Sequence, residues 1–145
     1  MENTMENATD NYELLTGITF FAMYFGIAIL FLIIFKTVYG LATPHAEWKL
    51  IKEDKNTAAA IGFGGAIIGF SAALAGAVSN SGGLIDFAIW GVIALIAQVI
   101  AFSVVRFVFM PKISLRIENN EVSAGIVLGA TNVAVGLINA ACMSY

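Results

Sequence analysis

The residues that could do chemistry within the apolar parts of this chain are three amides, Gln98, Asn132 and Asn139. Gln98 and Asn132 each lie near the middle of a long apolar stretch, and Asn139 follows Asn132 by one heptad, so these two share a helix face. An amide in hydrocarbon must find a hydrogen-bond partner, either by joining helices or by lining a path for water or a solute. Both interpretations stay open, and the joining of helices is favoured.

Other reactive side chains are sparse and poorly placed for catalysis. The single histidine, His45, has no second metal ligand at a useful spacing, and the single cysteine, Cys142, cannot form an internal disulfide. Carboxylates such as Glu13 and Asp86 lie at the ends of the apolar stretches, whereas proton-coupled pumps generally use a carboxylate inside the membrane. We predict a protein that is not an enzyme, with no metal, no cofactor and no nucleic-acid partner.

Four apolar stretches must position the amides. Of the 145 residues, 59% are hydrophobic and 12% are charged, against about 25% charged residues in soluble domains. The stretches cover residues 14–38, 57–78, 84–110 and 122–143. Each has the roughly 20 residues that a helix needs to cross about 30 Å of hydrocarbon. We predict an all-α membrane protein with four transmembrane helices in a single domain, residues 1–145.

Basic residues are confined to two of the connections between these stretches. They are Lys36, Lys49, Lys52 and Lys55 around the first, and Arg106, Lys112 and Arg116 around the second. By the positive-inside rule these loops are cytoplasmic, so both termini and the loop at residues 79–86 face outward. Tyr39 and Trp48 are predicted at the inner interface, where aromatic belts are common. The acidic N-terminal stretch predicts an uncleaved first span and no signal peptide.

The two halves of the chain resemble each other. Residues 53–79 align without gaps on residues 118–144, with identical residues at several positions. Each half reads as a bulky span, a basic loop and a span of small residues. We predict two parallel-duplicated two-helix hairpins, with repeat 1 at about 12–79 and repeat 2 at about 82–145, related by an axis along the membrane normal.

The segments NTAAAIGFGGAIIGF and SAGIVLGATNVAVGLINAACM carry a family resemblance. With the charged loop before them, they resemble the YjfL-like bacterial inner-membrane proteins, the family of domain of unknown function 350 and UPF0719 type. The resemblance covers nearly the whole chain after the first ten residues. In that family the loop before the second span often reads Asp-Asn, and here it reads EDKN. The resemblance implies a multi-pass protein of the bacterial inner membrane and brings no activity or catalytic residues.

Glycine and alanine gather on one face of the second and of the fourth predicted helix. The glycines that we predict to pack helices together are Gly62, Gly65, Gly69, Gly125, Gly129 and Gly136. They include two GxxxG pairs, which let backbones approach closely where lipid offers little hydrophobic drive. We predict an oligomerising scaffold or accessory subunit, whose partners are the bilayer and either further copies or another membrane protein. The alternative is a small oligomeric channel or transporter with a polar mid-membrane site.

Overall fold

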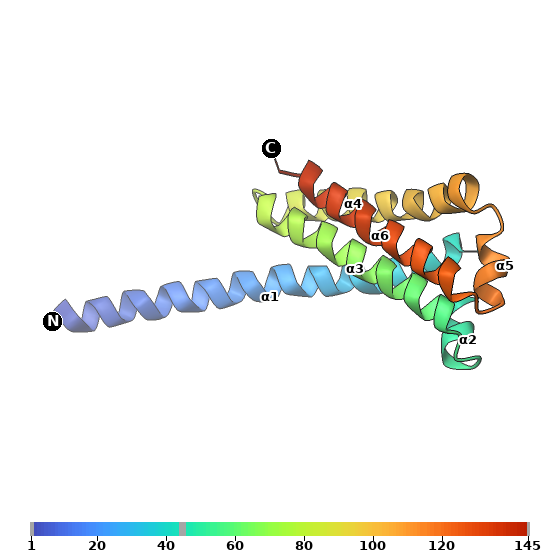
Figure 1. Cartoon of the computed structure of the whole chain (residues 1–145). Coiled ribbons are helices and arrows are strands. Elements are labelled where there is room, and N and C mark those ends of the chain that lie inside the picture. The colour runs from blue at the N-terminus through green and yellow to red at the C-terminus, as the bar shows by residue number, and fades with distance from the viewer. Residues whose placement is uncertain (1, 44–45, 145) are drawn as a thin grey trace.

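The computed structural model describes residues 2–43 and 46–144, and in these ranges the chain consists of helices and short turns (Figure 1). The helices are α1 (Glu2–Ala42), α2 (Glu47–Lys52), α3 (Thr57–Asn80), α4 (Leu84–Val104), α5 (Ile113–Glu118) and α6 (Val122–Cys142). A π-helical turn, η1 (Val105–Phe109), extends α4. Four helical segments of the described part are long and apolar enough to cross a membrane, which confirms the predicted all-α fold.

The helix ends follow from the local sequence. The side chain of Asn56 caps α3 by accepting a hydrogen bond from the backbone N–H of Ala59 at 2.8 Å. The helical path through α4 and η1 ends at Met110, whose φ of −151° lies outside the helical region, which Pro111 disfavours for the residue before it. α1 continues beyond both ends of the predicted span and has 41 residues, a length of about 60 Å.

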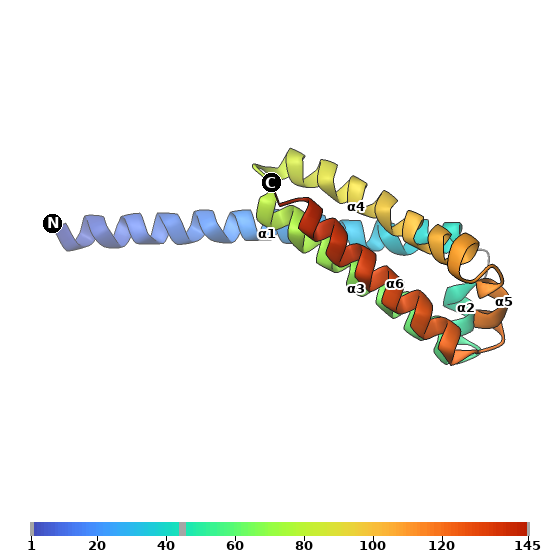
Figure 2. The ribbon, with the colours of Figure 1, turned by 45° about the horizontal axis from the view of Figure 1, so that its top comes forward.

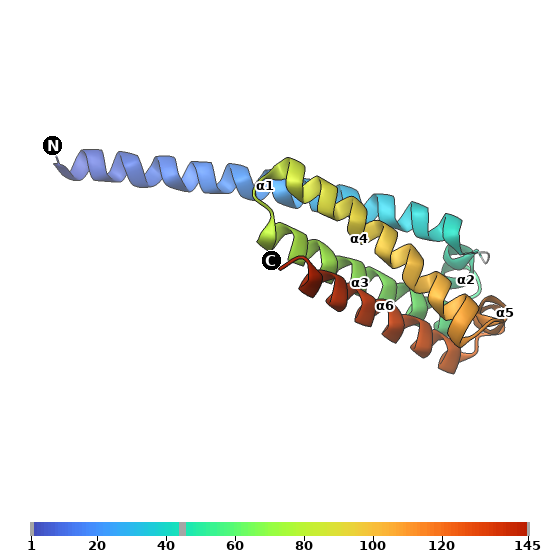
Figure 3. The ribbon, with the colours of Figure 1, turned by 90° about the horizontal axis from the view of Figure 1, so that it is seen from above.

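The long helices form a bundle around one close pair. α3 and α6 lie side by side along their length, and α4 packs against both (Figures 2 and 3). α1 touches α3 and α4 with its C-terminal half, while its N-terminal half projects beyond the other helices. α2 and α5 cover one end of the bundle, and the start of α1 and the end of α6 lie towards the opposite end (Figure 1).

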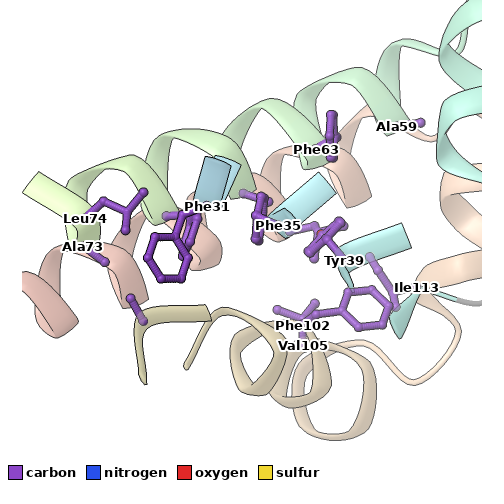
Figure 4. Packing of buried hydrophobic residues seen from close by; sticks show 14 of the residues in the cluster. Phe31, Phe35, Tyr39, Ala59, Phe63, Ala73, Leu74, Phe102, Val105 and Ile113 are labelled. Carbon is purple, nitrogen blue, oxygen red and sulfur yellow. The ribbon is translucent and has the colours of Figure 1, made fainter. Parts of the chain in front are cut away.

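An aromatic stripe attaches α1 to the other helices. Phe31, Phe35 and Tyr39 recur every four residues, so they lie on one face of α1, and all three are buried (Figure 4). The ring of Phe35 stacks on that of Phe70 in α3 with centroids 4.6 Å apart, and Tyr39 meets Phe102 of α4 edge-on at 6.0 Å. Tyr39 is therefore buried between the helices, and its level near the inner interface stays a prediction.

The order of elements repeats along the chain. A long apolar helix, a six-residue helix and a glycine-rich helix occur as α1, α2 and α3 and again as α4, α5 and α6. The turns before α3 and α6 each hold one residue in the left-handed backbone region, Lys55 with φ 49° and Asn120 with φ 57°. These residues correspond in the predicted alignment of the halves. The duplication stays a prediction. The predicted repeat unit did not include the short helices α2 and α5.

Candidate functional site: the glycine interface and its buried amides

The glycines that the sequence analysis selected all lie between α3 and α6, which run in the same direction. They are Gly62, Gly65 and Gly69 of α3 and Gly125, Gly129 and Gly136 of α6, and each is buried. We call this contact the glycine interface. Since both helices belong to one chain, these glycine faces are occupied within the protomer.

The glycine interface is a contact between backbones. A Cβ atom at Gly65 would lie 2.6 Å from the carbonyl carbon of Gly129, and one at Gly125 would lie 2.8 Å from the Cα atom of Ala58. Both distances are shorter than a carbon–carbon contact of about 3.5–4.0 Å, so the helices would have to move apart to accept a side chain. This approach also permits weak Cα–H···O contacts between the helices.

Gln98 of α4 reaches into the glycine interface. The side chain is fully buried, and Nε2 donates to the carbonyl oxygens of Ala66 in α3 (3.3 Å) and Asn132 in α6 (3.2 Å). Gly69 provides the room, because a Cβ atom there would lie 2.7 Å from this nitrogen. Both neighbours are carbonyl oxygens, which can only accept, so the nitrogen of the amide must face them. One side chain thus joins three helices.

The side chain of Asn132 is also fully buried and has different partners. Its Nδ2 donates to the carbonyl oxygen of Leu128 one turn earlier (3.0 Å) and to the hydroxyl oxygen of Tyr39 on α1 (3.4 Å). We call Gln98, Asn132 and Tyr39 the amide cluster. Because Gln98 also bonds the backbone of α3, the amide cluster links all four long helices at one depth.

Two oxygens of the amide cluster, Gln98 Oε1 and Asn132 Oδ1, have no hydrogen-bond partner among the described residues. A buried acceptor without a donor costs free energy, and in native proteins such a group often marks an internal water or a functional position. Asn139 lies apart from the cluster: it is half-buried, and its Nδ2 has no partner in the described ranges either. The structure therefore brings together two of the three predicted amides.

Two asparagines tie the halves of the chain together at the α2–α5 end. Asn56, before α3, donates from Nδ2 to the carbonyl oxygen of Ile117 at the end of α5 (2.7 Å). In return, Oδ1 of Asn120, before α6, accepts from the backbone N–H of Ala58 in α3 (3.0 Å). Asn56 also caps its own helix, so its side chain satisfies backbone groups of both halves.

Replacing Asn56 with alanine is expected to lower the free energy of unfolding by about 1–3 kcal/mol. The substitution removes an N-cap, worth about 1 kcal/mol, and one of two donors to the carbonyl oxygen of Ile117, which keeps its hydrogen bond from the backbone N–H of Asn120 (2.9 Å). Thermal unfolding in detergent measures the loss. Asn119→Ala changes an exposed asparagine of the neighbouring turn and serves as the control, expected within about 0.5 kcal/mol of the parent. Equal losses in both variants would contradict the role of Asn56.

An ion pair fixes the turn between α5 and α6. Arg116 donates from Nε to Glu121 Oε2 (2.6 Å) and from Nη2 to Oε1, and the Ser123 hydroxyl donates to Oε1 (2.9 Å). The hydrogen bonds from Arg116 and then from Ser123 lower the pKa of Glu121 to about 2. The ionised carboxylate therefore stabilises the fold at neutral pH, and this contribution is lost as the pH falls from about 4.5 to about 2. Both side chains are partly exposed, so the contribution is small.

Three residues of these contacts were missed by sequence reasoning, and each carried a signal. Asn56 stands directly before an apolar helix, which is a typical N-cap position. Asn120 is asparagine, one of the non-glycine residue types enriched in left-handed backbone. Tyr39 follows Phe35 by four residues, so it continues the buried face of α1.

Comparison with known proteins agrees with the resemblance drawn from the sequence. The family model described as Domain of Unknown Function (DUF350) matches residues 13–143. Over 133 residues the chain is 39% identical to the UPF0719 inner membrane protein YjfL of Escherichia coli (strain K12), covering 92% of this chain and 99% of that protein. Over 121 residues it is 29% identical to the UPF0719 transmembrane protein YshE of Bacillus subtilis (strain 168), covering 83% of this chain and 90% of that protein. No solved structure matches the chain.

Proposed function

This chain belongs to the DUF350 family and is a multi-pass inner-membrane protein, and we propose that it acts there as a non-catalytic scaffold or accessory subunit. The names of the two relatives state a membrane location and no enzymatic activity. The proposal rests on how the chain distributes its contacts. Small and polar groups are enclosed within the protomer, and one long helix is left almost bare.

α1 is the bare helix. In its most apolar window only 11% of the residues are buried against the protein, against 50% in α3. The uncharged stretch of α1 at residues 14–35 is about 33 Å long, close to the roughly 30 Å thickness of hydrocarbon. Aromatic side chains of α1, including Phe20, Phe21 and Phe25, stay more than half exposed in the protomer. We infer that a second copy of the chain packs on this exposed part of α1.

Disulfide cross-linking in native membranes tests the scaffold. In a Cys142→Ser background, Ile18→Cys places a single thiol on the exposed face of α1, and a disulfide-linked dimer is expected as the major oxidised product. Ile96→Cys, on the exposed face of α4, is the matched control and is expected to stay monomeric. Monomers at Ile18, Phe25 and Ile33 alike would contradict self-association. A link from Ile18→Cys to a different protein would favour the accessory-subunit form of the proposal.

The orientation is part of the proposal. The basic connections lie at the end of the bundle that carries α2 and α5, and the two chain ends lie towards the other end. The positive-inside rule then places the α2–α5 end in the cytoplasm and both termini outside. A reporter that is active only outside the cytoplasm is expected to work when fused after Tyr145 and to be silent when inserted near Lys52. The reverse pattern would overturn the orientation.

A channel or transporter is the second candidate, and one observation favours it. Gln98 Oε1 and Asn132 Oδ1 are buried acceptors about half-way along their helices, without a partner in the described part of the chain, and such groups can face a solute or water. Both residues are fully buried in the protomer, which favours the structural role. Solute and ion flux into vesicles containing the purified protein separates the candidates: the scaffold proposal expects rates equal to those of protein-free vesicles.

A further inference from the structure

A small pocket opens where the end of α1 meets α2 and the start of α3. Its volume is about 150 Å³, several times the share of about 30 Å³ that a water molecule occupies in the liquid. Lys36 of α1 and Lys49 of α2 line it, together with the ring of Trp48. The pocket is therefore large enough for a small polar group, and lysines from two different helices line it.

Two lysines share the tryptophan at this pocket. The Nζ atom of Lys36 lies 4.3 Å from the centroid of the Trp48 ring, and that of Lys52 lies 5.3 Å from it. Trp48 and Lys52 are four residues apart on α2 and so lie on the same face, while Lys36 comes from α1. Each cation is attracted by the ring, but the two ammonium groups repel each other. An anion beside the ring would offset this repulsion.

The charge at the pocket is positive even when its acid is counted. Glu47 also lines the pocket, and its side chain is buried. It offsets one of the two lysines that line the pocket, so about one net positive charge remains there, and Lys52 adds another beside the Trp48 ring. The opposite wall is apolar, since the ring of Phe63 lines the pocket and meets Trp48 edge-on at 5.8 Å. A ligand with an anionic head and an apolar body fits these surroundings.

The expected depth of the pocket in the membrane indicates which class of anion it would bind. Lys36 is the first basic residue of α1 and follows an uncharged stretch about as long as the hydrocarbon is thick. Lysine at that position extends its ammonium group to the head-group layer, and tryptophan prefers the same layer. Basic pockets between helices at this level bind the head groups of anionic lipids.

We propose that the α1–α2 corner, formed by Lys36, Trp48, Lys49 and Lys52, binds the phosphate group of an anionic phospholipid. The phosphate occupies the pocket between Lys36 and Lys49, with Lys52 beside it across the Trp48 ring. The acyl chains extend along the exposed apolar side of α1. This inference goes beyond the proposed scaffold function and does not depend on it, because a lipid can bind a single copy of the chain.

Fluorescence quenching by brominated lipids tests the site. The chain has two tryptophans, so Trp90→Phe leaves Trp48 as the only tryptophan, and excitation at the red edge of its absorption band avoids the tyrosines. The protein is reconstituted in mixtures of phosphatidylglycerol and phosphatidylcholine, with bromine on the acyl chains of one lipid at a time. The ratio of the two quenching curves gives the preference of the Trp48 site for each lipid. We expect phosphatidylglycerol to be preferred by about fivefold or more.

Charge-matched variants assign the preference to the corner. Lys36→Gln with Lys52→Gln is expected to bring the preference close to one, whereas Lys55→Gln with Lys112→Gln, which removes the same charge elsewhere at the α2–α5 end, leaves it unchanged. Lys36→Arg with Lys52→Arg keeps the cations and their ring contacts and is expected to keep the preference. This variant separates lipid binding from a general loss of structure.

Three results would overturn the proposal. The first is equal quenching by both lipids in the parent protein. The second is an equal loss of preference in the corner variant and in its charge-matched control. The third is full competition by inorganic phosphate in the buffer, which would mean that the corner binds a soluble anion and not a lipid. Resistance to inorganic phosphate together with sensitivity to the corner lysines supports the lipid as the source.

Discussion

Gly65→Ala is expected to lower the free energy of unfolding by about 2–3 kcal/mol, a large effect for a single methyl group. The added Cβ atom would lie 2.6 Å from the carbonyl carbon of Gly129, so the backbones of α3 and α6 have to separate. Separation also moves Asn132, whose carbonyl oxygen holds the amide of Gln98. Lipid supplies little hydrophobic drive to restore the contact, because the association of membrane helices depends on close packing.

The adjacent residue provides a control for this experiment. A Cβ atom added at Gly64 meets nothing within 4 Å, so Gly64→Ala makes the same chemical change on the same helix without touching α6. Alanine is the better helix former by about 1 kcal/mol, and Gly64→Ala is therefore expected to be neutral or stabilising. Unfolding in detergent with increasing denaturant measures both variants. Similar stability of the two would mean that α3 and α6 do not meet at Gly65.

The close packing of α3 and α6 through small residues could be predicted from the sequence, because membrane helices associate in only a few ways. Small residues on one face of two spans predict a close contact whatever else the chain contains. The sequence did not predict which helix each small-residue face contacts. The glycines were predicted to pack helices together, in a protein predicted to oligomerise, and Gly65 and Gly129 face each other inside one protomer. Face periodicity identifies a surface that must be covered, and it does not distinguish a neighbour in the same chain from a second copy.

The amides show the same limit at the level of single atoms. Gln98 and Asn132 each lie near the middle of an apolar stretch, so counting residues along each helix puts them at similar depth. Similar depth does not specify the acceptor, and in the structure Gln98 bonds the backbone carbonyl of Asn132 and not its side chain. Which acceptor an amide reaches depends on side-chain rotamers and on the space left by Gly69, and neither appears in a pattern of residue types.

Gln98→Glu is expected to be the most damaging change at the amide cluster, although it replaces a single NH₂ group with oxygen. In the structure that nitrogen faces the carbonyl oxygens of Ala66 (3.3 Å) and Asn132 (3.2 Å). A carboxylate would turn two hydrogen bonds into two repulsions and place a charge at a fully buried position. Acidic side chains at mid-membrane cost about 2.5–3.5 kcal/mol, and we expect a destabilisation of that size at neutral pH.

The pH dependence of this variant provides a second readout. Protonation of the introduced carboxyl group removes the charge and supplies one donor for a carbonyl oxygen, so the deficit is expected to shrink as the pH is lowered. Gln98→Met is the uncharged control. It forfeits two hydrogen bonds, at about 0.6 kcal/mol each, but also removes the oxygen that has no partner in the described structure, so its net cost is expected to stay below about 1 kcal/mol.

The same pair of variants separates a sealed core from a wet passage. If Gln98 lined a passage, water would solvate the carboxylate, Gln98→Glu would be nearly as stable as the parent protein at neutral pH, and flux into vesicles would change. If the amide cluster is sealed, the order of stability is parent, then Gln98→Met, then Gln98→Glu by a wide margin, with no flux in any of the three. The order follows from dielectric surroundings alone, because an identical carboxylate costs little in water and several kcal/mol in a dry core. Unfolding at pH 7 and pH 5 in detergent, paired with flux in vesicles, therefore decides between the two functional classes with side chains of nearly equal size.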